Sequence, residues 1–282
     1  MMKNNQTLRV GRLWLEGIVL LILRVVQLNT GFDPYTGLAL PSTAGRVLWI
    51  LLLVCIAAEA VLCFRQPKGG KRSFACCFQG LEDAKVPGLR LEGAWVPGLI
   101  AGGFLLAGGG ALLLVDALLP QSTLEMIAAA AGLLGIAGGA GFLLLVKKLR
   151  SGDGLSVYPL LPAMFFSVLF LLSVYFPEEG NPVLARFYLP LLAAAMAALF
   201  LYQLSMFFQA GGSLRGFSFI AGLTVITCFA AMADFAADPV RVKLLIDVGF
   251  AVIASIFLLI QRAEPLPEPE NPAEEENKEK AV

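Results

Sequence analysis

The fold is decided by residues 95–146, which read WVPGLIAGGFLLAGGGALLLVDALLPQSTLEMIAAAAGLLGIAGGAGFLLLV. Two apolar stretches, 95–117 and 124–146, are separated here by a short connection. Each stretch has the roughly 20 residues that an α-helix needs to cross the hydrocarbon core of a bilayer. In lipid every backbone N–H and C=O group must find a partner within the protein, and a continuous helix supplies those partners. This region therefore predicts a transmembrane helical hairpin.

Six further apolar stretches of similar length follow the same pattern, at 13–29, 46–64, 157–176, 185–208, 217–236 and 243–261. None shows the alternation of apolar and polar residues that is typical of a membrane barrel. The sequence thus predicts an all-α, polytopic transmembrane helix bundle of about eight spans, with a membrane domain over 13–261. The short connection between 217–236 and 243–261 leaves a seven-helix alternative open.

The composition excludes several classes of function. The chain is 58% hydrophobic and only 15% charged, whereas soluble domains carry about 25% charged residues. Its formal net charge of +0 gives no field that would attract nucleic acid. It has no histidine, and its five cysteines form no CxxC pair, which removes the commonest metal ligand and the histidine-dependent nucleophiles. We therefore assign no catalytic, cofactor-binding or metal-binding residue and expect that the protein is not an enzyme.

The basic residues predict the orientation of the helices. Sixteen of the 21 lysines and arginines fall in segments on the side of the N-terminus, four fall on the other side, and Arg24 lies within a helix. Cytoplasmic loops carry the excess of lysine and arginine, so both termini are expected in the cytoplasm. The cytoplasmic parts are then an N-terminus at 1–12, a loop at 65–94 and an acidic, disordered tail at 262–282.

A polar stripe marks the first apolar helix. At 100° per residue, Glu16, Arg24 and Gln27 lie within about 80° of one another. Charges that face lipid are costly, so this stripe is expected to point into the bundle. Arg24 and Asp247 lie at similar depths in the first and last helices, which predicts that they pair. Asp116 and Asp234 are competing partners for Arg24.

Two other features complete a candidate intramembrane polar site. Glu16 and Glu59 lie at similar depths, so they are expected to be neighbours in a relay for protons or cations. They could instead reach water or pair with Lys147 or Lys148. Tyr202, with Gln203 and Ser205, predicts an inward polar patch on the helix at 185–208. The candidate site contains these residues: Arg24, Asp247, Glu16, Glu59, Gln27 and Tyr202.

Glycines dominate the two helices of the hairpin at 95–146. Gly98 with Gly102, and Gly135 with Gly139, have the small-xxx-small spacing that lets helix backbones approach closely. These glycines are expected either to pack the hairpin internally or to contact a partner membrane protein or a second copy of the chain.

The second half of the chain shows a family resemblance. It includes LLPAMFFSVLFLLSVYF at 160–176, FYLPLLAAAMAALFLYQLSMFFQAGG at 187–212 and MADFA at 232–236. This pattern resembles uncharacterised polytopic membrane proteins of clostridial-type bacteria. The resemblance implies a bacterial plasma membrane and carries no functional residue.

Two functions remain open from the sequence. Many helices, short loops and intramembrane charges favour a transporter or permease-like protein for a small solute or ion. Glycine-rich helix faces and a charged cytoplasmic loop and tail favour a membrane sensor or scaffold that binds partner proteins. The expected partners are the lipid bilayer and either another membrane protein or a second copy of the chain, and no nucleic acid is expected.

Overall fold

The structure is a computed structural model of the whole chain. It describes residues 3–33, 38, 40–65, 73–78, 95–118, 125–151, 156–175, 188–209, 211–236 and 242–262. Most of the cytoplasmic loop predicted at 65–94, and the predicted tail beyond Arg262, lie outside the described residues.

The predicted all-α bundle is confirmed. Among the described residues, eight helices are long and apolar enough to cross a membrane. The elements run in this order: α1 Lys3–Thr30, α2 Thr43–Phe64, α3 Phe74–Cys77, α4 Trp95–Ala117, α5 Glu125–Ser151, the 3-10 turn η2 Tyr158–Leu160, α6 Leu161–Tyr175, α7 Tyr188–Gln209, α8 Leu214–Ala231, the 3-10 turn η5 Met232–Ala236, and α9 Val242–Ile260. The chain is therefore a multi-pass integral membrane protein.

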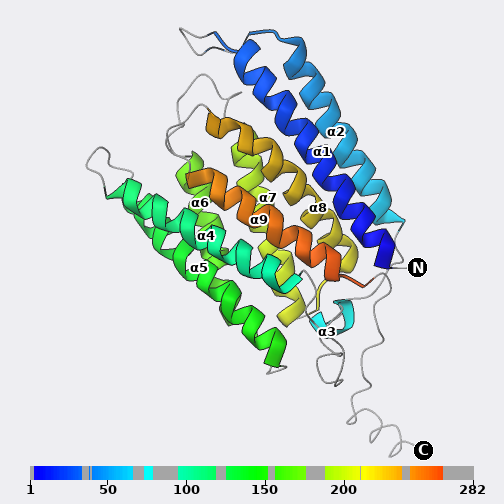
Figure 1. Cartoon of the computed structure of the whole chain (residues 1–282), viewed down its shortest axis with the longest axis vertical. Coiled ribbons are helices and arrows are strands. Elements are labelled where there is room, and N and C mark those ends of the chain that lie inside the picture. The colour runs from blue at the N-terminus through cyan, green and yellow to red at the C-terminus, as the bar shows by residue number, and fades with distance from the viewer. Residues whose placement is uncertain are drawn as a thin grey trace, which may run out of the picture.

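The last two spans are separate helices, so the seven-helix alternative is wrong. The 3-10 turn η5 ends α8, and α9 begins at Val242. With an even number of spans, the start of α1 and the end of α9 lie at the same end of the bundle (Figure 1). Arg9 and Arg262 both lie there, and we call it the basic end. The other end, which holds Arg24 and η5, is the opposite end.

Helix α1 begins ten residues earlier than the apolar stretch at 13–29 predicts. Residues from Lys3 onward, which were expected to form a polar N-terminus, continue the helix into the bundle. Polar side chains can enter because Arg9 and Arg12 find an acidic partner on α2, Glu59. The hydropathy of a single segment counts its charged residues as unfavourable in lipid. It takes no account of a partner on another helix that neutralises them.

Helix α8 occupies the centre of the bundle. In an 18-residue window of the span at 214–234, 72% of the residues are buried, against 28% in the corresponding windows of α1 and α2. Helix α8 packs against α1, α2, α7 and α9. The α1–α2 hairpin lies on one side of the bundle and the α4–α5 hairpin on the other (Figure 1). The outward faces of α1 and α2 are apolar, as contact with lipid requires.

The four predicted packing glycines all contact other helices of this chain. A Cβ atom added at Gly98 or Gly102 would lie 2.6 Å or 2.5 Å from the side chains of Ile256 and Ile253 on α9. One added at Gly135 would lie 2.8 Å from the Cα atom of Gly110 on α4. At Gly139 it would lie 2.8 Å from the backbone N of Ala107, also on α4. These glycines therefore pack α4 between α5 and α9.

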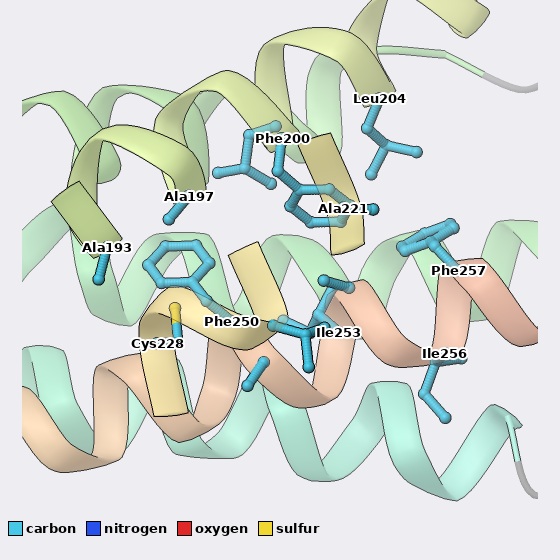
Figure 2. Close-up of a cluster of buried hydrophobic side chains, with 14 of the residues drawn as sticks. Ala193, Ala197, Phe200, Leu204, Ala221, Cys228, Phe250, Ile253, Ile256 and Phe257 are labelled. Carbon is cyan, nitrogen blue, oxygen red and sulfur yellow. The ribbon is translucent and has the colours of Figure 1, made fainter. Parts of the chain in front are cut away.

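The core between α7, α8 and α9 matches large side chains with small ones. Figure 2 shows Ala193 and Ala197 of α7 facing the ring of Phe250 on α9, with Cys228 of α8 beside it. Phe250 is fully buried, as is Cys228. In lipid, helix association depends on this kind of close van der Waals packing rather than on a hydrophobic drive.

A segment of the predicted loop closes the basic end. Phe74, at the start of α3, stacks on Phe208 of α7 with ring centroids 4.7 Å apart. Phe78 meets Phe207 and Phe217 edge-to-face. The backbone N–H of Arg262 donates to the carbonyl oxygen of Cys77 at 2.8 Å. The short helix α3 is thus a plug packed into the ends of α7, α8 and α9, within a segment that the sequence predicted as a loop.

Candidate functional site

Two polar clusters lie along the inner face of α1, where it meets α8. The first surrounds Glu59 near the basic end, and the second surrounds Arg24 near the opposite end. Arg9 and Arg24 are fifteen residues apart in one helix, which at 1.5 Å per residue separates the clusters by about 22 Å. We call the contact surface between α1 and α8 the seam.

The basic-end cluster is built on a fully buried carboxylate, Glu59 of α2. Two arginines of α1 bind it: Arg9 pairs with Oε1, where its Nε donates at 3.0 Å, and Arg12 pairs with Oε2. Arg9 also donates to the thiol sulfur of Cys63 at 3.1 Å and to the carbonyl oxygen of Ser218 at 3.2 Å. The cluster therefore ties α1 to both α2 and α8.

Gly222 of α8 makes room for this cluster. A Cβ atom at this position would lie 2.7 Å from Oε1 of Glu59, so only glycine admits the carboxylate against α8. Glu16 completes the charge balance because Arg12 reaches its Oε1 at 3.3 Å, one helical turn away. Two arginines thus face two glutamates, which is the pairing that buried charges require. Nη1 of Arg9 and Oε2 of Glu16 are buried without a hydrogen-bond partner.

Glu16 and Glu59 belong to one cluster. The two carboxylates act on each other electrostatically, in keeping with the similar depths that the sequence suggested. The partners of Glu59 are Arg9 and Arg12, and not the lysines that the sequence offered. Of those lysines, Lys147 is exposed on α5, and Lys148 donates to Ser156 at 2.9 Å.

The opposite-end cluster corrects the predicted pair of Arg24 and Asp247. Arg24 is buried and binds Asp234, with its Nη2 2.5 Å and its Nε 3.2 Å from the carboxylate oxygens. Its Nη1 donates to the side-chain oxygen of Gln27 at 2.9 Å. The prediction compared depths along α9, whereas α1 packs against η5, the turn that carries Asp234. A match in depth does not say which neighbouring helix faces the charge.

Asp247 nevertheless lies close to this cluster. Its side chain is 3% exposed. The charges that act on it are those of Lys243, one turn earlier on α9, and Asp234. Asp247 also acts on the buried thiol of Cys228 on α8. It therefore lies behind Asp234, between α8 and α9.

An apolar layer separates the two clusters along the seam. Leu13 and Leu20 of α1 are fully buried. A Cβ atom at Gly17 would lie 2.7 Å from the Cβ atom of Phe229, so α1 and α8 meet closely there. Trp14 packs edge-to-face on Phe229 with centroids 5.1 Å apart and donates its indole N–H to Ser255 at 2.8 Å. With both clusters paired and this layer packed, the seam is closed along its length.

Tyr202 does not join the site. It is 51% exposed and lies on the outward face of α7, so the predicted inward patch is wrong for this residue. Ser205 is buried, but its hydroxyl donates to the carbonyl oxygen of Tyr202 at 2.7 Å, within α7. Residues 202, 203 and 205 cannot all share one helix face at 100° per residue, and this signal was available in the sequence.

The sequence reasoning missed Arg9 and Arg12 because it placed them before the helix. Their spacing still carried the signal: Arg9, Arg12 and Glu16 extend the stripe of Arg24 and Gln27 toward the N-terminus at helical intervals. Ser218 and Ser255 carried no such signal, since isolated serines in apolar stretches commonly bond their own helix backbone.

No family model, curated protein or solved structure matches the chain. The resemblance to uncharacterised membrane proteins therefore stays a prediction. Among the residues that the structure describes, no three His, Cys, Asp or Glu side chains are grouped to hold a metal ion.

Proposed function

We propose that this protein is a permease-like transporter of a small solute or ion in the bacterial plasma membrane, with both termini in the cytoplasm. One observation carries the proposal: two buried ion-pair clusters lie at opposite ends of the α1–α8 seam, with an apolar layer between them. The cluster of Glu59 is the cytoplasmic gate, and the pair of Arg24 and Asp234 is the outer gate. In this proposal, the arrangement with both gates closed is the occluded state.

Ion pairs suit such gates because they break at little net cost when water enters. Burying two charges carries a desolvation penalty that offsets much of their attraction, so a hydrated open state is close in free energy to the paired state. Alternating access in many transporters is the movement of one helix group against another around a central site. Here α1 is the moving element, and α2 and α8 with the glycine-packed helices are fixed, so movement of α1 breaks the pairs of Arg9 and Arg12 with Glu59 and the pair of Arg24 with Asp234.

The alternative function, a sensor or scaffold, depended on glycine faces that could meet a partner and on a charged loop and tail that lie mostly outside the described residues. Gly98, Gly102, Gly135 and Gly139 each meet another helix of this chain. The observation that favoured a partner is thus explained by internal packing, and the transporter is the better-supported proposal.

The proposal can be tested with one reporter placed between the gates. Leu20 is fully buried in the apolar layer, four residues from Arg24. Leu20→Cys is made in a chain whose five cysteines are replaced by alanine. A membrane-impermeant maleimide is then applied to right-side-out and to inside-out vesicles. With both gates intact, we expect slow labelling from either side.

Opening one gate is expected to expose the reporter to one side only. Glu59→Gln should admit the maleimide from the cytoplasmic side, and Asp234→Asn from the outer side. Asp116→Asn and Lys147→Gln serve as controls, because both residues are exposed and lie at the two ends. A reporter that stays unlabelled in both gate variants, or is labelled from the same side in both, contradicts the proposal.

A further inference from the structure

The most unusual charge in the described part of the molecule is Asp247, and the inference drawn from it rests on the proposed transport function. Asp247 lies five residues into α9, and its side chain is 3% exposed. No hydrogen bond or ion pair joins its carboxylate to another described residue. Asp234, its acidic neighbour, is held by Arg24 at 2.5 Å. Asp234 and Asp247 therefore lie close enough for their charges to act on each other, and Arg24 binds Asp234.

The groups around Asp247 come from four helices or turns. Lys243 precedes it by one turn of α9, and Asp234 faces it from η5. Cys228 faces it from α8. The α4 surface packed on this part of α9 presents Gly109, which meets Ile246, and Leu106, which meets Gly249. An apolar wall and a second carboxylate thus surround Asp247, and Lys243, one turn away, is the cation that acts on it.

An anionic carboxylate in such a place is costly. Moving a charge out of water without a hydrogen-bonded partner carries a penalty large enough that the group neutralises instead. Na⁺ or Mg²⁺ would require several oxygen ligands. A proton needs only the carboxylate itself as its acceptor, so a proton is the simplest ion for this site to bind.

We propose that Asp247 is the proton-binding site that couples transport to a proton gradient. When the outer gate opens, water reaches Asp247, and a hydronium ion from the outer solution transfers a proton to its carboxylate, which becomes a carboxylic acid while the hydronium becomes water. Closing the gate excludes water and traps the neutral acid. When the seam opens on the cytoplasmic side, the acid returns its proton to water there, and the carboxylate forms again. No other bond changes in this cycle.

The proton itself is observable in the purified full-length protein. An aspartate in water is ionised above about pH 4, so a carboxylic acid at neutral pH identifies a buried, protonated group. Infrared spectroscopy in detergent measures the C=O stretch of the acid, and exchange into D₂O shifts that band. We expect a band that is lost in Asp247→Asn and retained in Asp116→Asn, whose acid is exposed at the same end. Asp247→Glu should restore an acid band at a shifted frequency.

Coupling is measured in liposomes that contain the protein and a trapped pH-sensitive dye. An imposed inward proton gradient should acidify the lumen faster than in protein-free liposomes. Asp247→Asn should reduce this rate to that of protein-free liposomes, and Asp116→Asn should leave it unchanged. Circular dichroism and gel filtration establish that the variants are folded.

The possible failures are distinguishable. An acid band or a proton flux that survives Asp247→Asn overturns this inference. The two-gate transporter then still stands if Leu20→Cys is labelled from opposite sides in the two gate variants. If Leu20→Cys is not labelled from opposite sides, the transporter is overturned, and coupled proton movement with it, whatever the infrared band shows.

Discussion

The two hairpins of the molecule, α1–α2 and α4–α5, meet their neighbours in different ways. Helices α4 and α5 approach backbone to backbone, with Gly110 against Gly135 and Gly139 against Ala107. Helix α1 meets α2 and η5 through charged pairs near its two ends, and it meets α8 through a close contact in the middle, at Gly17. Backbone packing loses its dispersion energy over a small displacement. Water can hydrate the charges of a broken ion pair, so α1 is suited to move and the α4–α5 hairpin to stay fixed.

The largest effect is expected where a buried charge loses its partner. Arg24→Gln removes the buried cation that binds Asp234, and breaking a buried pair in this way typically costs about 3–5 kcal/mol of unfolding free energy. The double variant Arg24→Gln with Asp234→Asn should recover much of that loss, because neither charge remains. Denaturant unfolding in detergent measures both. Arg46→Gln, at an exposed site on α2, is the matched control, and a single variant as mild as this control would contradict an electrostatic seam.

The plug is expected to belong to the fixed group. Phe74→Ala removes a ring that stacks on Phe208 and is 2% exposed. Truncating a buried phenylalanine costs about 3–5 kcal/mol, and here the loss falls on the docking of α3. In a chain that keeps Cys77 as its only cysteine, the buried Cys77 thiol should react much faster with maleimide when Phe74→Ala is present than when Phe74 is intact. Phe104→Ala, at a 62% exposed position of α4, should leave that rate unchanged. Equal rates in both variants would show that α3 is not docked.

The glycine packing predicts smaller changes in stability, which differ in sign between a closely packed glycine and an open one. Gly139→Ala places a methyl group 2.8 Å from the backbone N of Ala107, and such overpacking costs about 1–3 kcal/mol. At Gly108 the nearest atom would be 3.8 Å away, on Leu245. Gly108→Ala should therefore be neutral or stabilise the helix by up to about 1 kcal/mol. Thermal unfolding in detergent compares the two variants. Equal midpoints would mean that α4 and α5 are not closely packed.

The smallest effect concerns the apolar layer of the seam. Trp14→Phe keeps a ring beside Phe229 but removes the indole N–H that donates to Ser255. The loss of one such hydrogen bond is worth about 0.5–1.5 kcal/mol. A double-mutant cycle with Ser255→Ala isolates this contact, because the serine hydroxyl also bonds Ala251. Strictly additive effects would show that Trp14 of α1 does not bind Ser255 of α9.

The sequence predicted the elements of the fold better than the contacts of the site. The stretch at 95–117 matches α4 in both of its bounds, because Trp95 and the loop beyond Ala117 mark the edges of the apolar core. The stripe of Glu16, Arg24 and Gln27 was found because its spacing is a property of one helix. The partner of Arg24 was not found, since Asp116, Asp234 and Asp247 lie at similar depths and only the packing of η5 on α1 selects among them.

By itself, the sequence determined that the chain crosses the membrane as about eight helices, because lipid cannot satisfy a polar backbone and long apolar stretches satisfy it only as helices. It also determined that the charge of Arg24 must be sheltered inside the bundle. The tertiary structure decided which carboxylate receives each arginine, that Asp247 pairs with none of the described residues, and that Phe74 closes one end. Those contacts depend on which helix faces pack together. Helices that are far apart in the sequence form them, so the pattern of a single segment does not predict them.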